Sequence, residues 1–268
     1  MIDKWNLMTN WNYVLPPSRP SDKQLHDIAL HCSDINKNSN VAVLGSTMEF
    51  RDLLFELGFE NIFVFERNKD FFDFTSQSRI YNNKENLVLG NWLHTIQNHK
   101  NYFSLILSDL TSGNIHYDKR NDFYLSIESA LMPDGFFCDK VLTHSNKFLS
   151  YKELLKKYET KSLNWQNINC FNCELLFLSD LLKLNMVVDT AKFYEILETE
   201  TTSKRINKFI AYTRLITPSN FIWHYGKSWE ELKTNYCNNL LLISEKEDES
   251  NSPYFNNLKH FTLKKIKS

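Results

Sequence analysis

Several patterns that mark common enzyme classes are missing from this sequence of 268 residues. Glycine occurs only six times. No stretch carries the G-x-G-x-x-G pattern of a dinucleotide-binding loop or the G-x-x-x-x-G-K-S/T pattern of a P-loop, which disfavours an NAD-dependent oxidoreductase and an NTP hydrolase. There is also no G-x-S-x-G or H-E-x-x-H motif, so nothing indicates a serine hydrolase or a zinc protease.

Membrane and metal signals are equally sparse. The first stretch, MIDKWNLMTNWNYVLPP, lacks the apolar core of a signal peptide, and charged residues interrupt the most apolar later run, CELLFLSDLLKLNMVV. Five cysteines at irregular spacing favour a reduced, cytoplasmic protein over a disulfide framework. Cys170 and Cys173 form an isolated C-x-x-C pair with no second pair or His-x-x-His nearby, so we expect no metal site.

The charge balance gives no sign of a nucleic-acid or membrane partner. The formal net charge is -1, and no stripe of basic and aromatic residues is visible. The hydrophobic fraction of 42% and the charged fraction of 24% are typical of a soluble globular protein. A small molecule or a peptide is therefore the expected partner.

Short apolar runs alternate with stretches of helical spacing between Val41 and about Val141. This alternation predicts βαβ crossovers and a parallel sheet with helices on both faces. One predicted helix, residues 120–132, is expected to end before Pro133. The five predicted strands are the runs NVAVLG, NIFVFE, ENLVLG, FSLILSDL and GFFCDKVL.

The pattern changes after residue 150, where long helical segments replace the alternation. Near the C-terminus, NNLLLISEKE and KHFTLKKI predict two antiparallel strands that close one edge of the sheet. The predicted organisation is a leader and cover segment at 1–40, a Rossmann-like core at 41–149, a helical insert or cap at 150–225, and a closing helix and β-hairpin at 226–268.

Candidate binding residues follow the first four predicted strands. In an open parallel sheet, ligands bind at the carboxyl ends of the strands, near the point where the strand order reverses. The side chains at these four ends are Gly45, Ser46 and Thr47; Glu66 and Arg67; Asn91 and Trp92; and Ser108 and Asp109.

Each of these residue types has a physical use at such an edge. Gly45 permits a tight turn and close approach of a ligand, and Ser46 and Thr47 can cap the next helix. Glu66 can accept hydrogen bonds from both hydroxyl groups of a ribose. Gly45 can equally be an ordinary corner glycine, and Glu66 a solvated acid at a strand end.

The residues after the third and fourth predicted strands can recognise a nucleobase and an amine. Asn91 can pair with an adenine edge while Trp92 covers its face, or Trp92 can simply be a partly buried core residue. Ser108 is the last residue of the most apolar run, and Asp109 follows it. Asp109 can accept from a cationic amine or orient a reacting group, which makes it a candidate catalytic residue as well.

Taken in order, these features resemble the class I S-adenosylmethionine (SAM)-dependent methyltransferases, which have a Rossmann-like fold. The segment LGSTMEFRDL resembles the LG-x-T-P-E-x-R-x-L loop of one branch, with Met48 in the proline position, although the E/D-x-G-x-G-x-G glycines usual in the family are missing. PPSRPS resembles the Arg-Pro-Ser leader of the same branch. The resemblance covers roughly residues 11–145 and the final hairpin, and it implies a seven-stranded, mostly parallel, doubly wound sheet with an antiparallel final strand.

The resemblance implies SAM as cofactor and a transferase activity. Because the sulfonium already activates the methyl carbon, the protein must mainly align the reactants. Arg19 could then bind the methionine carboxylate, or lie in a surface turn. His224 is a candidate base on the acceptor side, or part of an aromatic packing cluster. Transfer of the aminocarboxypropyl group of SAM and a non-catalytic SAM-fold binding protein are the alternatives.

Overall fold

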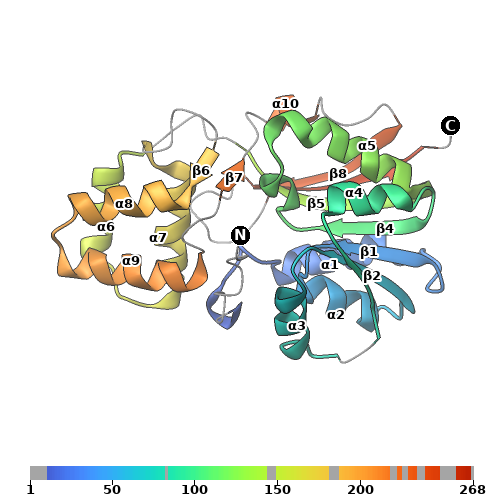
Figure 1. The fold of residues 1–268 in the computed structure, drawn as a ribbon, viewed down its shortest axis with the longest axis horizontal. Coiled ribbons are helices and arrows are strands. Elements are labelled where there is room, and N and C mark those ends of the chain that lie inside the picture. The colour runs from blue at the N-terminus through green and yellow to red at the C-terminus, as the bar shows by residue number, and fades with distance from the viewer. Residues whose placement is uncertain are drawn as a thin grey trace.

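A computed structural model describes residues 11–81, 84–143, 149–180, 187–217, 222–224, 229–233, 239–247 and 258–266. Its centre is a seven-stranded sheet with the strand order β3-β2-β1-β4-β5-β9-β8 (Figure 1). The pairs from β3 to β5 are parallel, and β9 runs antiparallel to both β5 and β8. The strands are β1 Asn40–Leu44, β2 Asn61–Glu66, β3 Asn86–Leu89, β4 Phe103–Ser108, β5 Leu131–Leu142, β8 Leu240–Glu247 and β9 Leu258–Lys265.

This topology confirms the predicted fold class. The chain folds as a mostly parallel, doubly wound, Rossmann-like sheet whose final strand is antiparallel. The order reverses between β1 and β4, which places the expected ligand edge at the carboxyl ends of these two strands.

Helices cover both faces of the sheet because alternate strand residues point to opposite sides. Val41 and Val43 pack with the helices of one face, whereas Ala42 and Leu44 pack with those of the other. The first face carries α1 Asp22–His31, α2 Met48–Glu56 and α3 Lys69–Gln77, and the second carries α4 Trp92–Thr95, α5 Arg120–Ala130 and α10 Trp229–Lys233.

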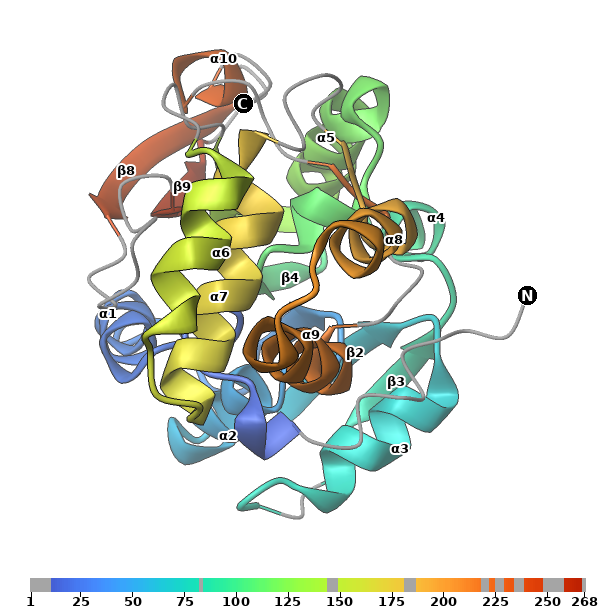
Figure 2. The same cartoon turned by 90° about the vertical axis from the view of Figure 1, so that its left-hand side faces the viewer.

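A group of helices stands beyond the carboxyl edge of the sheet, between β5 and β8 in the chain (Figure 2). Its core is continuous with Met48 at the start of α2 and Leu142 at the end of β5, so these helices rest directly on that edge. Among the described residues, no helix has the length and apolarity needed to span a bilayer. The elements of this group are α6 Tyr151–Glu159, α7 Trp165–Leu178, β6 Val187–Asp189, α8 Thr190–Glu200, α9 Lys204–Ile216 and β7 Ile222–His224.

The junction of α5 and β5 differs from the prediction. The helix ends at Ala130, two residues short of the predicted boundary, and β5 begins at Leu131. Pairing of β5 with β4 is then interrupted around Pro133 and Asp134, where the latter has a φ of +64°. Proline cannot donate to a sheet, so this irregularity accommodates it inside the strand.

Candidate functional site

The first loop of the site turns at Gly45. This residue has a φ of +83°, a conformation that glycine adopts without strain, and its N–H donates to the carbonyl oxygen of Phe65 at 2.8 Å. A Cβ built on Gly45 would have no atom within 4 Å. The loop therefore leaves open space beside its backbone, although it holds only one glycine.

Glu66 is anchored at the end of β2 by three hydrogen bonds. Its Oε2 accepts from the hydroxyl of Ser46 at 2.9 Å, and its Oε1 accepts from the backbone N–H groups of Arg67 and Asn68 at 2.8 and 2.9 Å. Burial raises the pKa of the Glu66 carboxyl, while the bonds from Asn68, Ser46 and Arg67 act in the opposite direction. Arg67 contributes a backbone hydrogen bond, and its charge also lowers the pKa of Glu66.

The capping prediction for the first loop is wrong. Thr47 is the N-cap residue of α2, but its side chain makes no capping hydrogen bond. Ser46 does not cap the helix either, because its hydroxyl donates to Glu66. The carboxylate of Glu66 lies next to the loop and offers a charged acceptor. The Ser46 hydroxyl therefore donates to Glu66 and does not cap the helix.

The third loop lies beside the second. The N–H of Gly90 donates to the carbonyl oxygen of Glu66 at 2.9 Å, which brings Asn91 next to the end of β2. Asn91 is exposed, and its side-chain oxygen caps α4 by accepting from the N–H of Leu93 at 3.1 Å. Trp92 is half-buried and packs on the core beneath α4 and α5. An adenine contact by this pair stays a prediction.

Asp109 faces a buried amine. Its Oδ1 lies 2.8 Å from the Nζ of Lys140, and the two side chains are 5% and 0% exposed. The same Nζ donates to the carbonyl oxygens of Pro17 and Arg19 at 2.7 and 3.2 Å and to the side chain of Gln24 at 3.4 Å. The cationic amine expected for Asp109 thus comes from β5 of the same chain and also holds the leader in place.

Ser108 lies on the opposite side of β4 from this pair, next to Asp139 of β5. Both side chains are buried, and the register of the strands makes them neighbours. Burial raises the pKa of Asp139 to about 8, while the hydrogen bond from the N–H of Lys140 to its Oδ1, at 2.9 Å, acts in the opposite direction.

Arg19 reaches the first loop but binds a carboxylate there. Its guanidinium forms an ion pair with Glu49 in the first turn of α2. The same Glu49 oxygen accepts from the indole N–H of Trp11 at 3.1 Å, and Arg19 lies over the Trp11 ring at 5.7 Å from its centre. The leader therefore folds over the loop that begins at Gly45.

His224 belongs to a separate cluster on the other side of the site. Its ring lies 4.9 Å from that of His116, and its backbone carbonyl accepts from the guanidinium of Arg120. Burial lowers the pKa of His224, and the nearby His116 and Arg120 lower it further. Sequence patterns did not single out Arg120 or Lys140, although a charge inside the apolar run GFFCDKVL was a visible signal for the latter.

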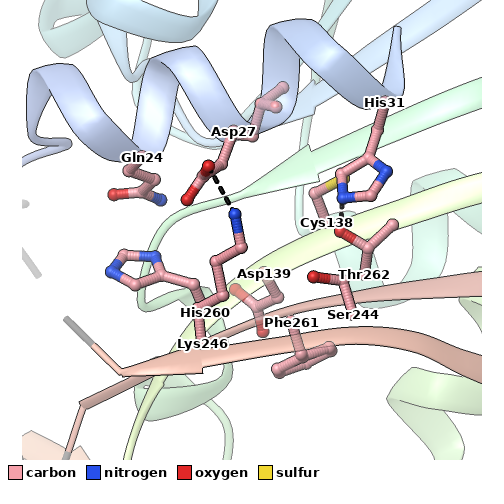
Figure 3. Close-up of a pocket in the computed structure, with 11 residues that line it drawn as sticks. Gln24, Asp27, His31, Cys138, Asp139, Ser244, Lys246, His260, Phe261 and Thr262 are labelled. Atoms are coloured by element: carbon pink, nitrogen blue, oxygen red, sulfur yellow. Dashed lines mark hydrogen bonds and ion pairs between the residues drawn. The ribbon is translucent and has the colours of Figure 1, made fainter.

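A small cavity lies on the face of the sheet that α1 covers (Figure 3). It measures about 20 Å³, and the ion pair between Asp27 and Lys246, at 2.5 Å, crosses its lining. His31 and Thr262 point into the same space. One water molecule needs a volume of this order, so the cavity cannot hold a nucleoside. No three His, Cys, Asp or Glu side chains gather as a metal site would require, as far as the described residues go.

Solved structures match the fold, whereas no protein-family model and no curated protein matches the sequence. A Rhodobacter sphaeroides protein, named provisionally as a Zn-dependent alcohol dehydrogenase, has a TM-score of 0.60 at 15% identity, covering 98% of this chain and 97% of its own. A SAM-dependent methyltransferase from Methanosarcina mazei has a TM-score of 0.53 at 9% identity, covering 89% and 97%. The N-methyltransferase NodS from Bradyrhizobium japonicum, solved with S-adenosylhomocysteine, has 0.53 at 9%, covering 99% and 100%. SAM-dependent methyltransferases are thus among the structural neighbours of this chain, and at these identities the likeness establishes the fold.

Proposed function

We propose that this protein is a SAM-dependent methyltransferase acting on a small molecule or a peptide. The observation that carries the proposal is the placement of Glu66. This buried acid ends β2 beside the open turn at Gly45, at the edge where the strand order reverses. That is where open α/β sheets bind nucleosides, with an acid after the second strand positioned for the ribose hydroxyl groups.

The residues at this edge fit a nucleoside. A carboxylate offers about four acceptor positions, and Glu66 uses three of them within the chain, so one is left for a ribose hydroxyl. The space beside Gly45 allows the ligand to approach the backbone. Arg19, which is 21% exposed beside the same loop, would contact the amino-acid end of the cofactor if it exchanged its ion pair with Glu49 for the carboxylate of SAM.

SAM would supply a methyl group that its sulfonium activates for transfer. The chain's own task is then alignment. Glu66 would orient the ribose, the leader would cover the first loop, and the helices beyond the carboxyl edge would form the acceptor side. The provisional name of the R. sphaeroides protein adds no activity to this proposal, because LGSTMEFRD lacks the G-x-G-x-x-G pattern expected for NAD.

Calorimetry with S-adenosylhomocysteine tests the proposal directly. We expect binding by the wild type, and the variant Glu66→Gln should weaken it by about 1–3 kcal/mol, since a charged acceptor is lost while the shape is kept. Glu60→Gln is the matched control, because Glu60 is an exposed acid just before the same strand and should leave the affinity unchanged. No binding by the folded wild type at roughly 0.5 mM would contradict the proposal.

The product of the cofactor separates the two transfer reactions. Methyl transfer leaves S-adenosylhomocysteine, whereas aminocarboxypropyl transfer leaves 5′-methylthioadenosine. Incubating the protein with SAM and candidate acceptors and measuring both nucleosides by mass spectrometry distinguishes them. Binding of SAM with release of neither product across such acceptors favours the non-catalytic alternative.

A further inference from the structure

Arg120 is a buried cation that forms no ion pair with any residue that the structure describes. It is 1% exposed at the start of α5, and one of its terminal nitrogens donates to the carbonyl oxygen of His224. Its Nε is buried and finds no hydrogen-bond acceptor in the described ranges. A buried guanidinium stays protonated in proteins, so an unmatched one is costly unless something else supplies negative charge.

Asp139 is the carboxyl group that acts electrostatically on Arg120, but it does not supply that negative charge at neutral pH. Asp139 acts on Arg120 through space, but it forms no ion pair with it among the described residues. Burial raises the pKa of Asp139 to about 8, so the group is mostly protonated and neutral at pH 7. Within the described part of the chain, the positive charge of Arg120 is therefore left without an ionised counterpart.

Imidazole and phenol rings surround the guanidinium of Arg120. The His224 and His116 rings meet at 4.9 Å, and the ring of Tyr117 lies 5.7 Å from the guanidinium. The pKa of His224 is lowered, so its imidazole is a neutral hydrogen-bonding group near pH 7. These side chains come from the start of α5, the short helical turn Tyr117–Lys119 before it, and β7.

The cluster lies at the carboxyl ends of β4 and β5, next to the proposed cofactor edge. β7 packs on the helical turn Thr111–Asn114, which follows β4. The contact is so close that a Cβ on Gly113 would overlap the Trp223 ring. Glu66, by contrast, marks the ends of β1 and β2. The proposed cofactor residues and the cluster thus belong to adjoining strands of one sheet edge.

We propose that Arg120, flanked by His224 and His116, binds a carboxylate group of the acceptor substrate. This inference rests on the proposed function, since it assigns the acceptor side of the same site. A carboxylate is favoured over a phosphate because one buried guanidinium balances one negative charge, whereas a phosphate carries between one and two. The planar guanidinium also matches the planar carboxylate.

Benzoate and its uncharged analogue benzamide serve as probes. We expect the wild type to bind benzoate with a Kd of roughly 1–10 mM and benzamide at least about tenfold more weakly. NMR signals of the His116 and His224 rings should shift on addition of benzoate. Arg120→Gln should lower the benzoate affinity by about tenfold or more, while Lys119→Gln, which removes an exposed cation in the same turn, should not change it.

Several results would overturn the inference. These are equal binding of benzoate and benzamide, tighter binding of inorganic phosphate than of benzoate, or unchanged benzoate binding by folded Arg120→Gln. If that variant does not fold, Arg120→Lys and the histidine shifts of the wild type decide the question. Titration with S-adenosylhomocysteine is a separate readout, so failure of the proposed function and failure of the carboxylate site are told apart.

Discussion

Replacing Lys140 with methionine is expected to destabilise the fold and to loosen the leader. The side chain is fully buried, and its Nζ holds Asp109 and the carbonyl oxygens of Pro17 and Arg19. Methionine keeps the length and the apolar stem, but it removes the cationic partner of the buried Asp109 carboxylate and the donor to two carbonyl groups. Breaking a buried ion pair by removing one partner costs about 3–5 kcal/mol, so we expect a loss of that order in the free energy of unfolding.

A double-mutant cycle measures the interaction itself. Asp109→Asn removes the carboxylate charge, and the double variant removes both charges at once. Because the two groups are in contact, the double variant should be more stable than the sum of the single effects predicts, by at least about 1 kcal/mol. Lys264→Met is the control, since Lys264 is 36% exposed in its ion pair with Asp134 and should cost less than about 1 kcal/mol.

Urea unfolding followed by circular dichroism gives the stabilities. Hydrogen exchange of peptides from residues 11–21 reports on the leader, which should exchange faster in Lys140→Met than in Lys264→Met. Unfolding of Lys140→Met within about 0.5 kcal/mol of the wild type, together with unchanged exchange of the leader, would refute the reasoning.

Two further predictions concern the buried carboxyl groups of Glu85 and Asp139. Arg51 and Arg79 share the buried carboxylate of Glu85, at 3.1 and 2.7 Å, so Glu85→Gln should cost about 3–5 kcal/mol in urea unfolding. Lys69→Ala, which breaks an exposed pair, should cost less than about 0.5 kcal/mol, and similar losses for both variants would be inconsistent with this account. Asp139 holds a proton in the folded state between its ordinary pKa and about 8, so its contribution to stability falls as the pH rises through that range. Asp139→Asn should therefore gain at least about 1 kcal/mol relative to the wild type between pH 5 and pH 8, and a constant difference would contradict the buried protonated acid.

The sheet could be predicted from the sequence because its signals are local. Val41 to Leu44 form a buried run that is followed by a glycine, and the next apolar run ends at Glu66. Runs of this kind mark strands and their carboxyl ends without knowledge of their neighbours. The antiparallel hairpin followed from two alternating runs separated by a polar loop.

The partners within the site could not be predicted, because they come from distant segments. Lys140 lies inside a predicted strand, and its contacts with Pro17, Gln24 and Asp109 depend on how the leader crosses the sheet. Arg19 does reach the first loop, but nothing local in the sequence indicated Glu49 as its partner. Sequence position at a strand end thus predicts where a side chain lies, and not what already binds it.

The close packing of Trp223 on Gly113 has a consequence for the ancestry of this chain. The two positions lie far apart in sequence, and a side chain at residue 113 would displace the indole from the turn that follows β4. Substitutions at these positions should therefore occur together during evolution, with a larger residue at 113 accompanied by a smaller one at 223. Such covariation would identify relatives of this protein even where the loop at Gly45 has diverged beyond comparison.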